Sequence, residues 1–501
     1  MGCADPTPPA GRRSGHVVSC LSTSSLSSPQ LTTYLPKMAS PHLKPSLLFV
    51  SHPLTGHLTP TLRVAAALPH QGFPVFFLGP TFHKTRIAAA AGGEITFLPL
   101  LGTADFNDLA YYSPDNPNPP TSNYFSLPWQ RRGWIDLERT WIDPIPDEWR
   151  SVVAALKEVY AREPARKVIV VAEAMFFGIM PLFYGAELPE GMERPRMVAL
   201  SVTVPFVRSR DVPAFFVEEE GKGGEGEKEG REEAWRRWEV CTGGLKKRME
   251  RALREAGAVL EGGLEGAFLS GQNYTCHEKI LQLGVPGWFY PRLDWPEGFK
   301  FLGVLPPAEE PVGGWANLPA WWDEVKGARE MEKKIVVVAQ GTVEVDPNDL
   351  ILPTLRGMAG RPADVLVVAI LGRKGAVLPE DFAVPENARV TDYLHYDAVL
   401  PYASAWVHNG GYGAVQHGIA HGVPMVVAGE GMDKVENARR IERSGVGLNL
   451  GPPGPWAEEV QKAVELVLDE ARYWQVAAKL RDESVGLRCF KSVGDEIDGL
   501  F

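Results

Sequence analysis

The stretch WVHNGGYGAVQHGIAHGVPMVVAGEGMDKVENA, residues 406–438, decides the fold of this 501-residue chain. An apolar run, AWVHNGG at 405–411, has the length of a buried strand and ends in the pair Gly410 and Gly411. A helix is predicted over 412–421, and PMVVAG at 424–429 is typical of another strand. Glycines at a strand-to-helix turn let the backbone approach a ligand, and the free amides of a helix start favour an anion. The stretch therefore predicts a phosphate or diphosphate site at one edge of a sheet.

Similar strands occur on both sides of this stretch along the chain. In the second half they are KKIVVVAQG (333–341), DVLVVAILG (364–372) and a short strand in NARVTDYL (387–394), with a helix near 349–359. In the first half they are SLLFVSHPL (46–54), FPVFFLGP (73–80) and KVIVVAEAMFF (167–177). Strand, helix and strand at this spacing form βαβ units and a parallel sheet. The sequence thus predicts two doubly wound, Rossmann-like α/β domains that face each other across a cleft.

The changes in composition along the chain suggest its domain boundaries. We expect a disordered extension at 1–44, a first domain at 45–304, a linker at 305–332, a second domain at 333–470, and helices at 471–501 that pack across both domains. The Ser-rich extension has alternative readings as an organelle transit sequence or as residues before a true start at Met38. The run EEEGKGGEGEKEGREE, at 218–233, has no apolar residue and is predicted to be a solvated, disordered loop.

Composition disfavours several classes of protein. Fifty-one Lys and Arg against 62 Asp and Glu give a net charge of -11, which argues against a dominant nucleic-acid surface. Five cysteines without a CxxC pair exclude a disulfide scaffold and fit a reducing compartment. No apolar run approaches the roughly 18 residues of a membrane span. We therefore expect a cytoplasmic protein with no nucleic-acid partner and no transmembrane segment, whose oligomeric state the sequence does not reveal.

The stretch at 406–438 resembles the donor-binding signature of the UDP-glycosyltransferase family. It is most similar to the microbial and fungal branch, which is related to macrolide and plant natural-product glycosyltransferases. GVPM at 422–425, Asp433, and the pair Asn437–Ala438 fix the register. The resemblance extends over about 46–485 and implies the GT-B fold, in which two Rossmann-like domains enclose a nucleotide sugar. It is more specific in the second half of the chain than in the first.

The resemblance implies a set of donor-binding residues, some of which differ from the family pattern. The family's diphosphate-binding His falls on Asn409, next to His408, and the Asn-Ser pair that follows it falls on Gly413 and Ala414. Diphosphate binding would then depend on backbone amides. The Glu that holds the ribose falls on His417, and the sugar-binding pair falls on Asp433 and Lys434. The complete predicted donor set is Gly341, Thr342, Tyr393, His408, Asn409, Gly410, Gly411, Gly413, His417, Asp433 and Lys434, with Tyr393 on the uracil and Gly341 and Thr342 facing the diphosphate.

The first half carries the predicted catalytic pair. SHPLTGHLTP resembles the family's GHxxP segment, which places the catalytic base on His57, and Glu173 is the nearest match for the carboxylate that orients it. An imidazole can deprotonate a hydroxyl near neutral pH, and a carboxylate fixes its tautomer. The chain has no DxD pair, and the resemblance implies an inverting reaction without a metal ion or other cofactor. As the alternative for each residue, His57 could cap a helix, Tyr393 could be packing, and His417 could be an ordinary surface histidine.

The predicted function is transfer of a hexose from a UDP-sugar to a hydroxyl of a lipophilic small molecule. The segment 102–150 is too irregular for a sheet, and its aromatic residues either line the acceptor site or form local core: Tyr111, Tyr112, Tyr124, Phe125, Trp129, Trp134 and Trp141. One alternative is a catalytically impaired ligand-binding or scaffold protein of the same fold. A second, a nicotinamide oxidoreductase, is disfavoured because neither first strand is followed by GxGxxG.

Overall fold

Two parallel sheets organise the chain, and a computed structural model gives their bounds. The first sheet has seven strands in the order β3-β2-β1-β4-β5-β6-β7. They are β1 (Ser46–Val50), β2 (Val75–Gly79), β3 (Ile95–Pro99), β4 (Val168–Glu173), β5 (Arg196–Ser201), β6 (Lys279–Gln282) and β7 (Phe299–Phe301). The central strand β1 is fully buried and pairs in parallel with β2 and β4, so Leu48 lies opposite both Phe76 and Val170. Strands covered on both faces read as continuous apolar runs, which is why these segments stand out in the sequence.

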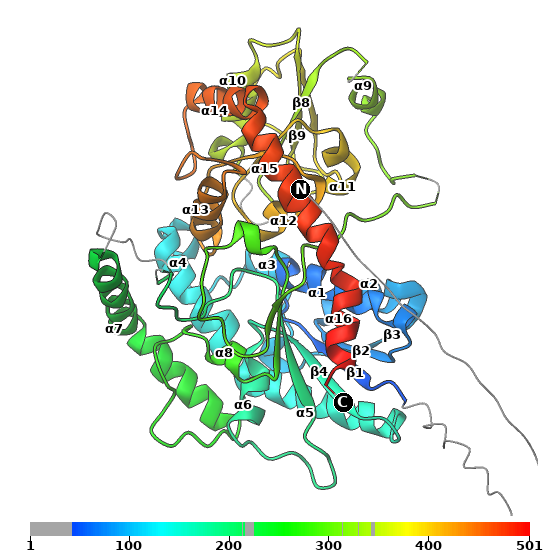
Figure 1. The fold of residues 1–501 in the computed structure, drawn as a ribbon, viewed down its shortest axis with the longest axis vertical. Coiled ribbons are helices and arrows are strands. Elements are labelled where there is room, and N and C mark those ends of the chain that lie inside the picture. The colour runs from blue at the N-terminus through cyan, green and yellow to red at the C-terminus, as the bar shows by residue number, and fades with distance from the viewer. Residues whose placement is uncertain are drawn as a thin grey trace, which may run out of the picture. The chain divides into compact units, whose positions relative to one another are not determined.

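The second sheet has six parallel strands in the order β10-β9-β8-β11-β12-β13. They are β8 (Lys334–Ala339), β9 (Val365–Ile370), β10 (Ala388–Thr391), β11 (Ala405–His408), β12 (Met425–Val427) and β13 (Gly447–Asn449). In both sheets the strand order reverses beside the first strand of the half, β1 or β8, which is the switch point where doubly wound folds bind ligands. The predicted fold class, two Rossmann-like α/β domains, is confirmed (Figure 1).

Helices connect and cover the strands. In the first half they are α1 (Thr55–Ala67), α2 (Lys84–Ala89), α3 (Asp108–Tyr111), α4 (Trp129–Asp136), α5 (Ile145–Arg162), α6 (Met180–Phe183), α7 (Glu225–Glu255) and α8 (Gln272–Thr275). In the second half they are α9 (Trp322–Gly327), α10 (Ile351–Met358), α11 (Tyr396–Val399), α12 (Tyr412–His421), α13 (Lys434–Ser444), α14 (Ala457–Asp469), α15 (Ala471–Leu487) and α16 (Cys489–Asp498). The helix predicted over 412–421 coincides with α12, whose C-terminus is closed by Gly422 at φ 65°.

The structure describes residues 43–212, 214–215, 225–312, 314–328, 330–341 and 346–500, with only the backbone of 225–229. Thr342 and nearly all of the predicted extension lie outside these residues. The acidic run at 218–233 was expected to be a loop, but residues 225–233 form the first turns of α7. Further along, Trp235 and Trp238 bury α7 against the core. An anchored helix extends by one hydrogen bond per residue without a new nucleus, and Glu and Lys are good helix formers.

Between β3 and β4, the aromatic segment is helical rather than extended. α4 continues into a π-helical turn, Leu137–Ile142, before α5 begins at Ile145. α5 is the amphipathic helix that covers one face of the first sheet, and it buries Trp149, Val152 and Leu156. The expected linker at 305–332 likewise contains a helix, α9.

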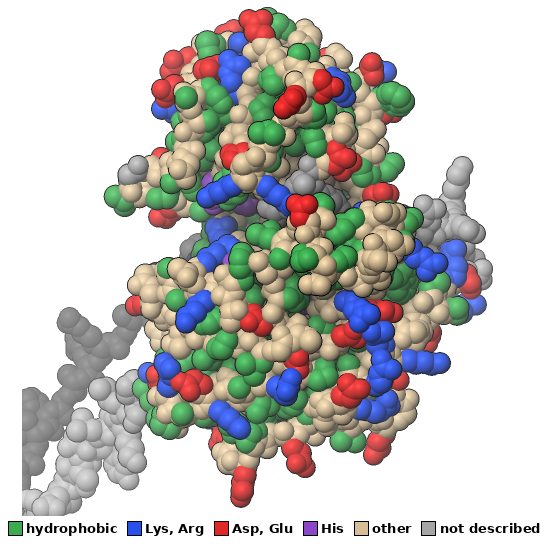
Figure 2. Space-filling view, turned by 180° about the vertical axis from the view of Figure 1, so that it is seen from behind, with side chains coloured by type: hydrophobic (Ala, Val, Ile, Leu, Met, Phe, Trp, Pro, Cys, Tyr) green, Lys and Arg blue, Asp and Glu red, His purple; other side chains and the backbone are tan. Residues whose placement is uncertain are grey.

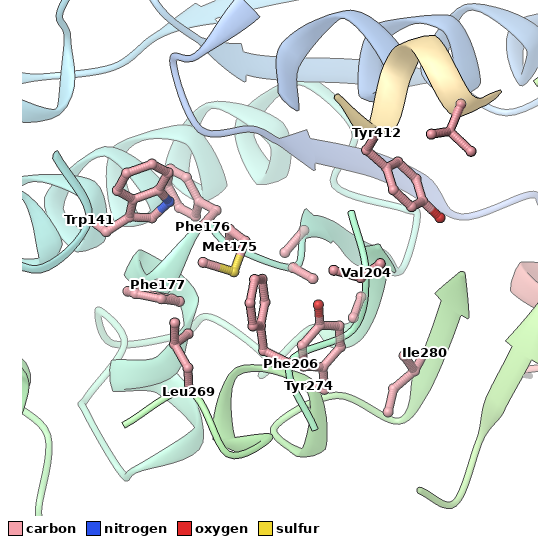
Figure 3. Packing of buried hydrophobic residues seen from close by; sticks show 14 of the residues in the cluster. Trp141, Met175, Phe176, Phe177, Val204, Phe206, Leu269, Tyr274, Ile280 and Tyr412 are labelled. Atoms are coloured by element: carbon pink, nitrogen blue, oxygen red, sulfur yellow. The ribbon is translucent and has the colours of Figure 1, made fainter. Parts of the chain in front are cut away.

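The two halves share one hydrophobic cluster. Tyr412 of α12 donates its hydroxyl to the carbonyl oxygen of Leu283 and accepts a hydrogen bond from Gln282 Nε2 at 2.9 Å. Its ring lies 5.6 Å from that of Trp288, edge to face. Figure 3 shows Tyr412 with Val204 and Tyr274 of the first half in this cluster. Contacts between the two halves are thus both apolar and hydrogen-bonded.

The C-terminal helices contact both halves (Figure 1). α15 packs on α12 of the second half, and Ser484 Oγ accepts a hydrogen bond from the backbone N–H of Val304 at 2.9 Å. α16 packs on α1, where Gln71 Nε2 donates to the carbonyl oxygen of Phe490 at 2.9 Å. Within the described part of the chain, every helix is too short or too polar to cross a lipid bilayer.

The loop after β9 packs closely on the end of β8, and two of its glycines, Gly372 and Gly375, provide a matched test of this contact. Both adopt positive φ, 86° at Gly372 and 79° at Gly375, but a Cβ on Gly372 would lie 1.9 Å from the carbonyl oxygen of Gly341, whereas one on Gly375 would meet nothing within 4 Å. Gly375→Ala is expected to cost about 1–2 kcal/mol of left-handed backbone strain. Gly372→Ala is expected to lower the free energy of unfolding by about 1–3 kcal/mol more, because the overlap is with backbone. Urea unfolding of both variants measures the difference; equal losses would contradict the close approach.

Candidate active site

His57 and Glu173 meet at the carboxyl ends of β1 and β4. His57 lies in the first turn of α1, which follows β1 directly, and Glu173 is the last residue of β4. His57 Nδ1 and Glu173 Oε2 are 3.1 Å apart, and the side chains are 19% and 0% exposed. The contact has ion-pair distance, but its direction deviates from a straight hydrogen bond. Glu173 Oε1 accepts a hydrogen bond from the backbone N–H of Met175 at 2.9 Å, so the carboxylate is held from both sides.

The charges around His57 favour its protonated form. Burial lowers the pKa of His57, but the carboxylates of Glu173 and Asp433 outweigh it and leave that pKa above its ordinary value. Asp433 of the second half also contacts Thr203, just after β5, and β5 is the strand beside β4. The predicted catalytic pair is thus brought together, at the sheet edge that Asp433 of the predicted donor set also contacts.

A second histidine lies behind His57. The ring of His52 stacks on Trp141 at 4.7 Å and lies 5.7 Å from the ring of His57. Its Nε2 is 2.8 Å from the carbonyl oxygen of Thr140, in the π-helical turn. Burial and the charge of His57 lower the pKa of His52 to about 3, so it is neutral. The rings of Trp141 and His57 also meet in a T-shaped arrangement, with centres 6.2 Å apart, so His57 lies beside aromatic rings.

Asp433 is held between the halves. It precedes α13, after Gly431 and Met432, which both have positive φ, 88° and 48°. Its Oδ2 accepts hydrogen bonds from Thr203 Oγ1 of the first half at 3.0 Å and from Asn437 Nδ2 at 3.1 Å. A positive φ at Met432 is strained for a side-chain-bearing residue, and such strain is concentrated at functional sites. Lys434 is the first residue of α13.

The glycine-rich turn after β11 adopts the expected strand-to-helix form. Gly410 has φ 81°, and a Cβ there would lie 3.2 Å from the carbonyl oxygen of Lys434, so a larger residue would be strained. Asn437 Nδ2 donates to the carbonyl oxygen of Gly410 at 2.8 Å. Gly411 caps α12, and the Cα of Gly413 faces open space in its first turn. The N–H groups of Gly410 and Gly411 donate to the side chains of His408 and Asn409, and the following turn of α12, which contains Gly413, is the part of the helix start that suits an anion.

Asn409 and His408 both contact the protein itself. Asn409 Nδ2 donates to the carbonyl oxygen of Gln340 at the end of β8, and Asn409 Oδ1 accepts from the N–H of Gly411 at 3.3 Å. His408 is 1% exposed and accepts a hydrogen bond from the N–H of Gly410 on Nδ1, at 3.1 Å. Burial lowers the pKa of His408 to about 3, so it is a neutral core residue. Asn409 thus joins β8 to the start of α12.

The remaining predicted donor residues lie at two places. Gly341 follows β8, with φ 86° and open space where a Cβ would be. Tyr393 follows β10 with 45% of its side chain exposed, and Lys374 Nζ lies 5.9 Å from its ring centre. An exposed ring beside a strand end is suited to stacking on a planar base.

His417 is bound to a buried carboxylate that the sequence reasoning missed. His417 Nδ1 and His421 Nε2 each lie 2.9 Å from Asp397 Oδ1, and Asp397 Oδ2 accepts from the backbone N–H of Ala308 at 2.8 Å. Burial by itself would raise the pKa of Asp397, but the hydrogen bonds from the two histidines hold it well below its usual range. His417 remains 25% exposed, whereas His421 is 7% exposed.

The aromatic residues of 102–150 divide into packed and accessible ones. Tyr124 donates to Asp136 Oδ1 at 2.7 Å, and Tyr111 donates to the same oxygen at 3.2 Å. Burial raises the pKa of Asp136 to about 6. Trp141 is 4% exposed, whereas Phe125 is 36% exposed. Part of this set is local core, and Trp141 is the ring that contacts the histidines.

Comparison with known proteins agrees with this geometry. The family model described as "Erythromycin biosynthesis protein CIII-like, C-terminal domain" matches residues 363–498. The chain is 33% identical over 457 residues to UDP-glucosyltransferase 1 of Beauveria bassiana, covering 90% of this chain and 94% of that protein. It is 32% identical over 457 residues to UDP-glucosyltransferase A1 of Starmerella bombicola, covering 91% and 92%. The chain belongs to the UDP-glycosyltransferase family.

A solved structure agrees on the fold of this UDP-glycosyltransferase family member. The crystal structure of the glycotransferase of kitacinnamycin superposes with a TM-score of 0.63, covering 91% of this chain and 98% of that one at 18% identity. The two sheets are therefore those of the GT-B fold, as predicted. Figure 2 shows the surface hollowed between the halves of the molecule, with histidine, lysine and arginine side chains at the edge of the hollow.

Three residues of the site were not predicted from the sequence. Thr203, Asn437 and Asp397 become neighbours of the predicted residues only through the fold. Asn437 served only to fix the register of the resemblance. For Thr203 a signal was present, since it follows β5, and residues at the carboxyl ends of parallel strands line the ligand crevice.

The His57–Glu173 contact predicts the protonation behaviour of His57. In Glu173→Gln, burial still lowers the pKa of His57 while the principal attraction is lost, so its pKa is expected to fall by about 1–3 pH units. NMR titration of the His57 ring measures the change. Glu148→Gln is the matched control, because Glu148 is 1% exposed and burial raises the pKa of its carboxyl well above its usual range, which disfavours its charged form. An unchanged His57 titration in Glu173→Gln would contradict the pairing.

Proposed function

We propose that this family member transfers a hexose from a UDP-sugar to a hydroxyl group of a lipophilic small molecule, with inversion and without a metal ion in the reaction. The observation that carries the proposal is the His57–Glu173 pair, at the sheet edge where Thr203 contacts Asp433. A buried carboxylate beside one ring nitrogen leaves the other nitrogen to take a proton, which is the arrangement of a general base.

The chemical step follows from the positions of these groups. His57 Nδ1 faces Glu173, so Nε2 is the atom that would accept the proton of the acceptor hydroxyl. The hydroxyl oxygen would then attack the anomeric carbon of the sugar. The bond between this carbon and the diphosphate oxygen would break on the opposite face, and UDP would leave with the electron pair. Glu173 would stabilise the imidazolium as it forms, which its influence on the pKa of His57 supports.

Donor binding is assigned to the second half. The amides of the first turn of α12 would hold the diphosphate, because Gly413 places no side chain in front of them. Tyr393 would stack on the base, His417 would face the ribose, and Asp433 would bind sugar hydroxyls. In this assignment Asn409 supports the turn through Gln340, in place of the charged histidine of the family pattern.

The acceptor would lie in the first half. The ring of His52, next to His57, contacts two aromatic rings. Its centre lies 4.7 Å from that of Trp141 and 5.8 Å from that of Phe106. Apolar rings beside a base favour a flat or lipophilic molecule that carries its hydroxyl at one end.

Turnover of labelled UDP-glucose with a panel of hydroxylated lipophilic acceptors tests the proposal. His57→Ala is expected to lower kcat/KM by about 10²–10⁴-fold, the usual contribution of a general base. Asn409→Ala is expected to weaken turnover less, because Asn409 supports a turn whose amides remain. His70→Ala, at an exposed histidine, is the matched control and should be unchanged.

Two results would count against the proposal. Full turnover in a stably folded His57→Ala variant would show that His57 is not the general base. Tight nucleotide binding, seen as thermal stabilisation that grows with nucleotide concentration, without glycoside from any acceptor would favour the catalytically impaired alternative.

The metal independence of the reaction has its own test. Enzyme treated with a chelator and then freed of it should transfer sugar at the same rate with and without added Mg²⁺ or Mn²⁺. The predicted diphosphate contacts are backbone amides, which need no bridging ion. A rate that depends on Mg²⁺ would refute this part of the proposal.

A further inference from the structure

Helix α12 carries two histidines one turn apart that point at the same carboxylate. His417 and His421 are four residues apart and lie on one face of the helix. Their ring nitrogens both approach Asp397 Oδ1, on the neighbouring helix α11, at 2.9 Å. The three donor atoms lie within 4.8 Å of one another. His57 and Glu173 are not part of this group.

We propose that Asp397, His417 and His421 form a binding site for a divalent transition-metal ion of the Zn²⁺ type. Imidazole and carboxylate are the ligands that such ions prefer, and three protein ligands leave a fourth position for water. The Asp397 side chain is fully buried, and His417 is 25% exposed, so the site has a rigid inner ligand and an open side.

The ion would replace two hydrogen bonds with metal–ligand bonds. Zn²⁺ binds His nitrogen and carboxylate oxygen at about 2.0–2.2 Å, which puts ligand atoms of a tetrahedral site roughly 3.3 Å apart. The observed nitrogen–oxygen distances of 2.9 Å would thus have to lengthen by about 0.4 Å each. The two ring nitrogens, which lie within 4.8 Å of each other, would have to reach the same spacing by side-chain rotation.

The surroundings already hold the ligands in place. Asp397 Oδ2 accepts from the backbone N–H of Ala308, and the ring of Tyr396 lies edge-on to that of His417 at 5.4 Å. A hydrogen bond to the second carboxylate oxygen and a packed ring are the kind of outer contacts that orient metal ligands. The ion would join α11 to α12, and the hydrogen bond from Ala308 would hold the shared carboxylate.

Two further charged or titratable groups face the site. His395 Nδ1 lies 3.9 Å from Asp397 Oδ2, with its ring stacked on Trp315, and it is the side chain nearest to serving as a fourth ligand. Arg63 also interacts with Asp397, and its positive charge opposes a cation. Its guanidinium donates to the carbonyl oxygen of Pro306, which directs it to the neighbouring segment.

Calorimetric titration of the full-length, chelator-treated protein with Zn²⁺ tests the site. We expect one saturable ion per chain, a rise in the unfolding temperature with Zn²⁺, and, for Co²⁺, the visible absorption of a tetrahedral site. Substitution of residues beyond the direct ligands of a metal site commonly weakens binding by 10–100-fold, so His421→Ala is expected to weaken it by at least about tenfold. The exposed-histidine variant His70→Ala should bind as the wild type does.

The Zn²⁺ titration tests this site independently of sugar transfer, because it is carried out without a nucleotide sugar. A lack of saturable Zn²⁺ binding, or equal binding by wild type and His421→Ala, would overturn the proposal and leave a purely hydrogen-bonded triad. Since His421 is nearly buried, His417→Ala is the second variant, at a more exposed position, and urea unfolding of both metal-free variants checks their folding. Loss of Zn²⁺ binding in a stable His417→Ala variant would support the site.

Discussion

The burial of Glu173 at the end of β4 is the constraint on which the candidate site depends. A carboxylate that is removed from water needs hydrogen bonds or an opposite charge, and here the Met175 amide and the His57 ring supply them. Because β1 and β4 are neighbours in a parallel sheet, their carboxyl ends lie at one edge, and α1 begins there. The pairing therefore follows from strand order, and it places Nδ1 of His57, not Nε2, against Glu173.

The second half brings a complementary set of groups to the same region. The turn after β11 exposes helix amides, and Asp433 is fixed by Thr203 and Asn437 across the boundary between the halves. The positively polarised start of a helix is suited to a phosphate group, and a carboxylate is suited to hydroxyl groups. The two could therefore bind opposite ends of one molecule. This division agrees with membership of a family named for its nucleotide-sugar substrates.

The histidines differ in burial, in charge and in the groups that their ring nitrogens contact. His408 and His52 are buried and neutral, and their nitrogens contact the backbone. His57 and His417 are partly exposed and each faces a buried carboxylate. Residue type alone did not separate these roles: His408 was placed in the predicted donor set, yet it is a core residue.

The sequence by itself determined the most apolar strands of both sheets and the helix at 412–421, because buried parallel strands are continuous apolar runs. The family resemblance paired His57 with Glu173, whereas β3, β5, β6, β7 and β13 were not predicted. The sequence did not determine that 225–233 is helical, since those turns depend on the anchoring of Trp235 and Trp238 further along α7. Nor did it place Thr203 on Asp433, or Asp397 between two histidines. Such contacts join residues 20 to 230 positions apart, and only the packing of one element on another brings them within hydrogen-bond distance.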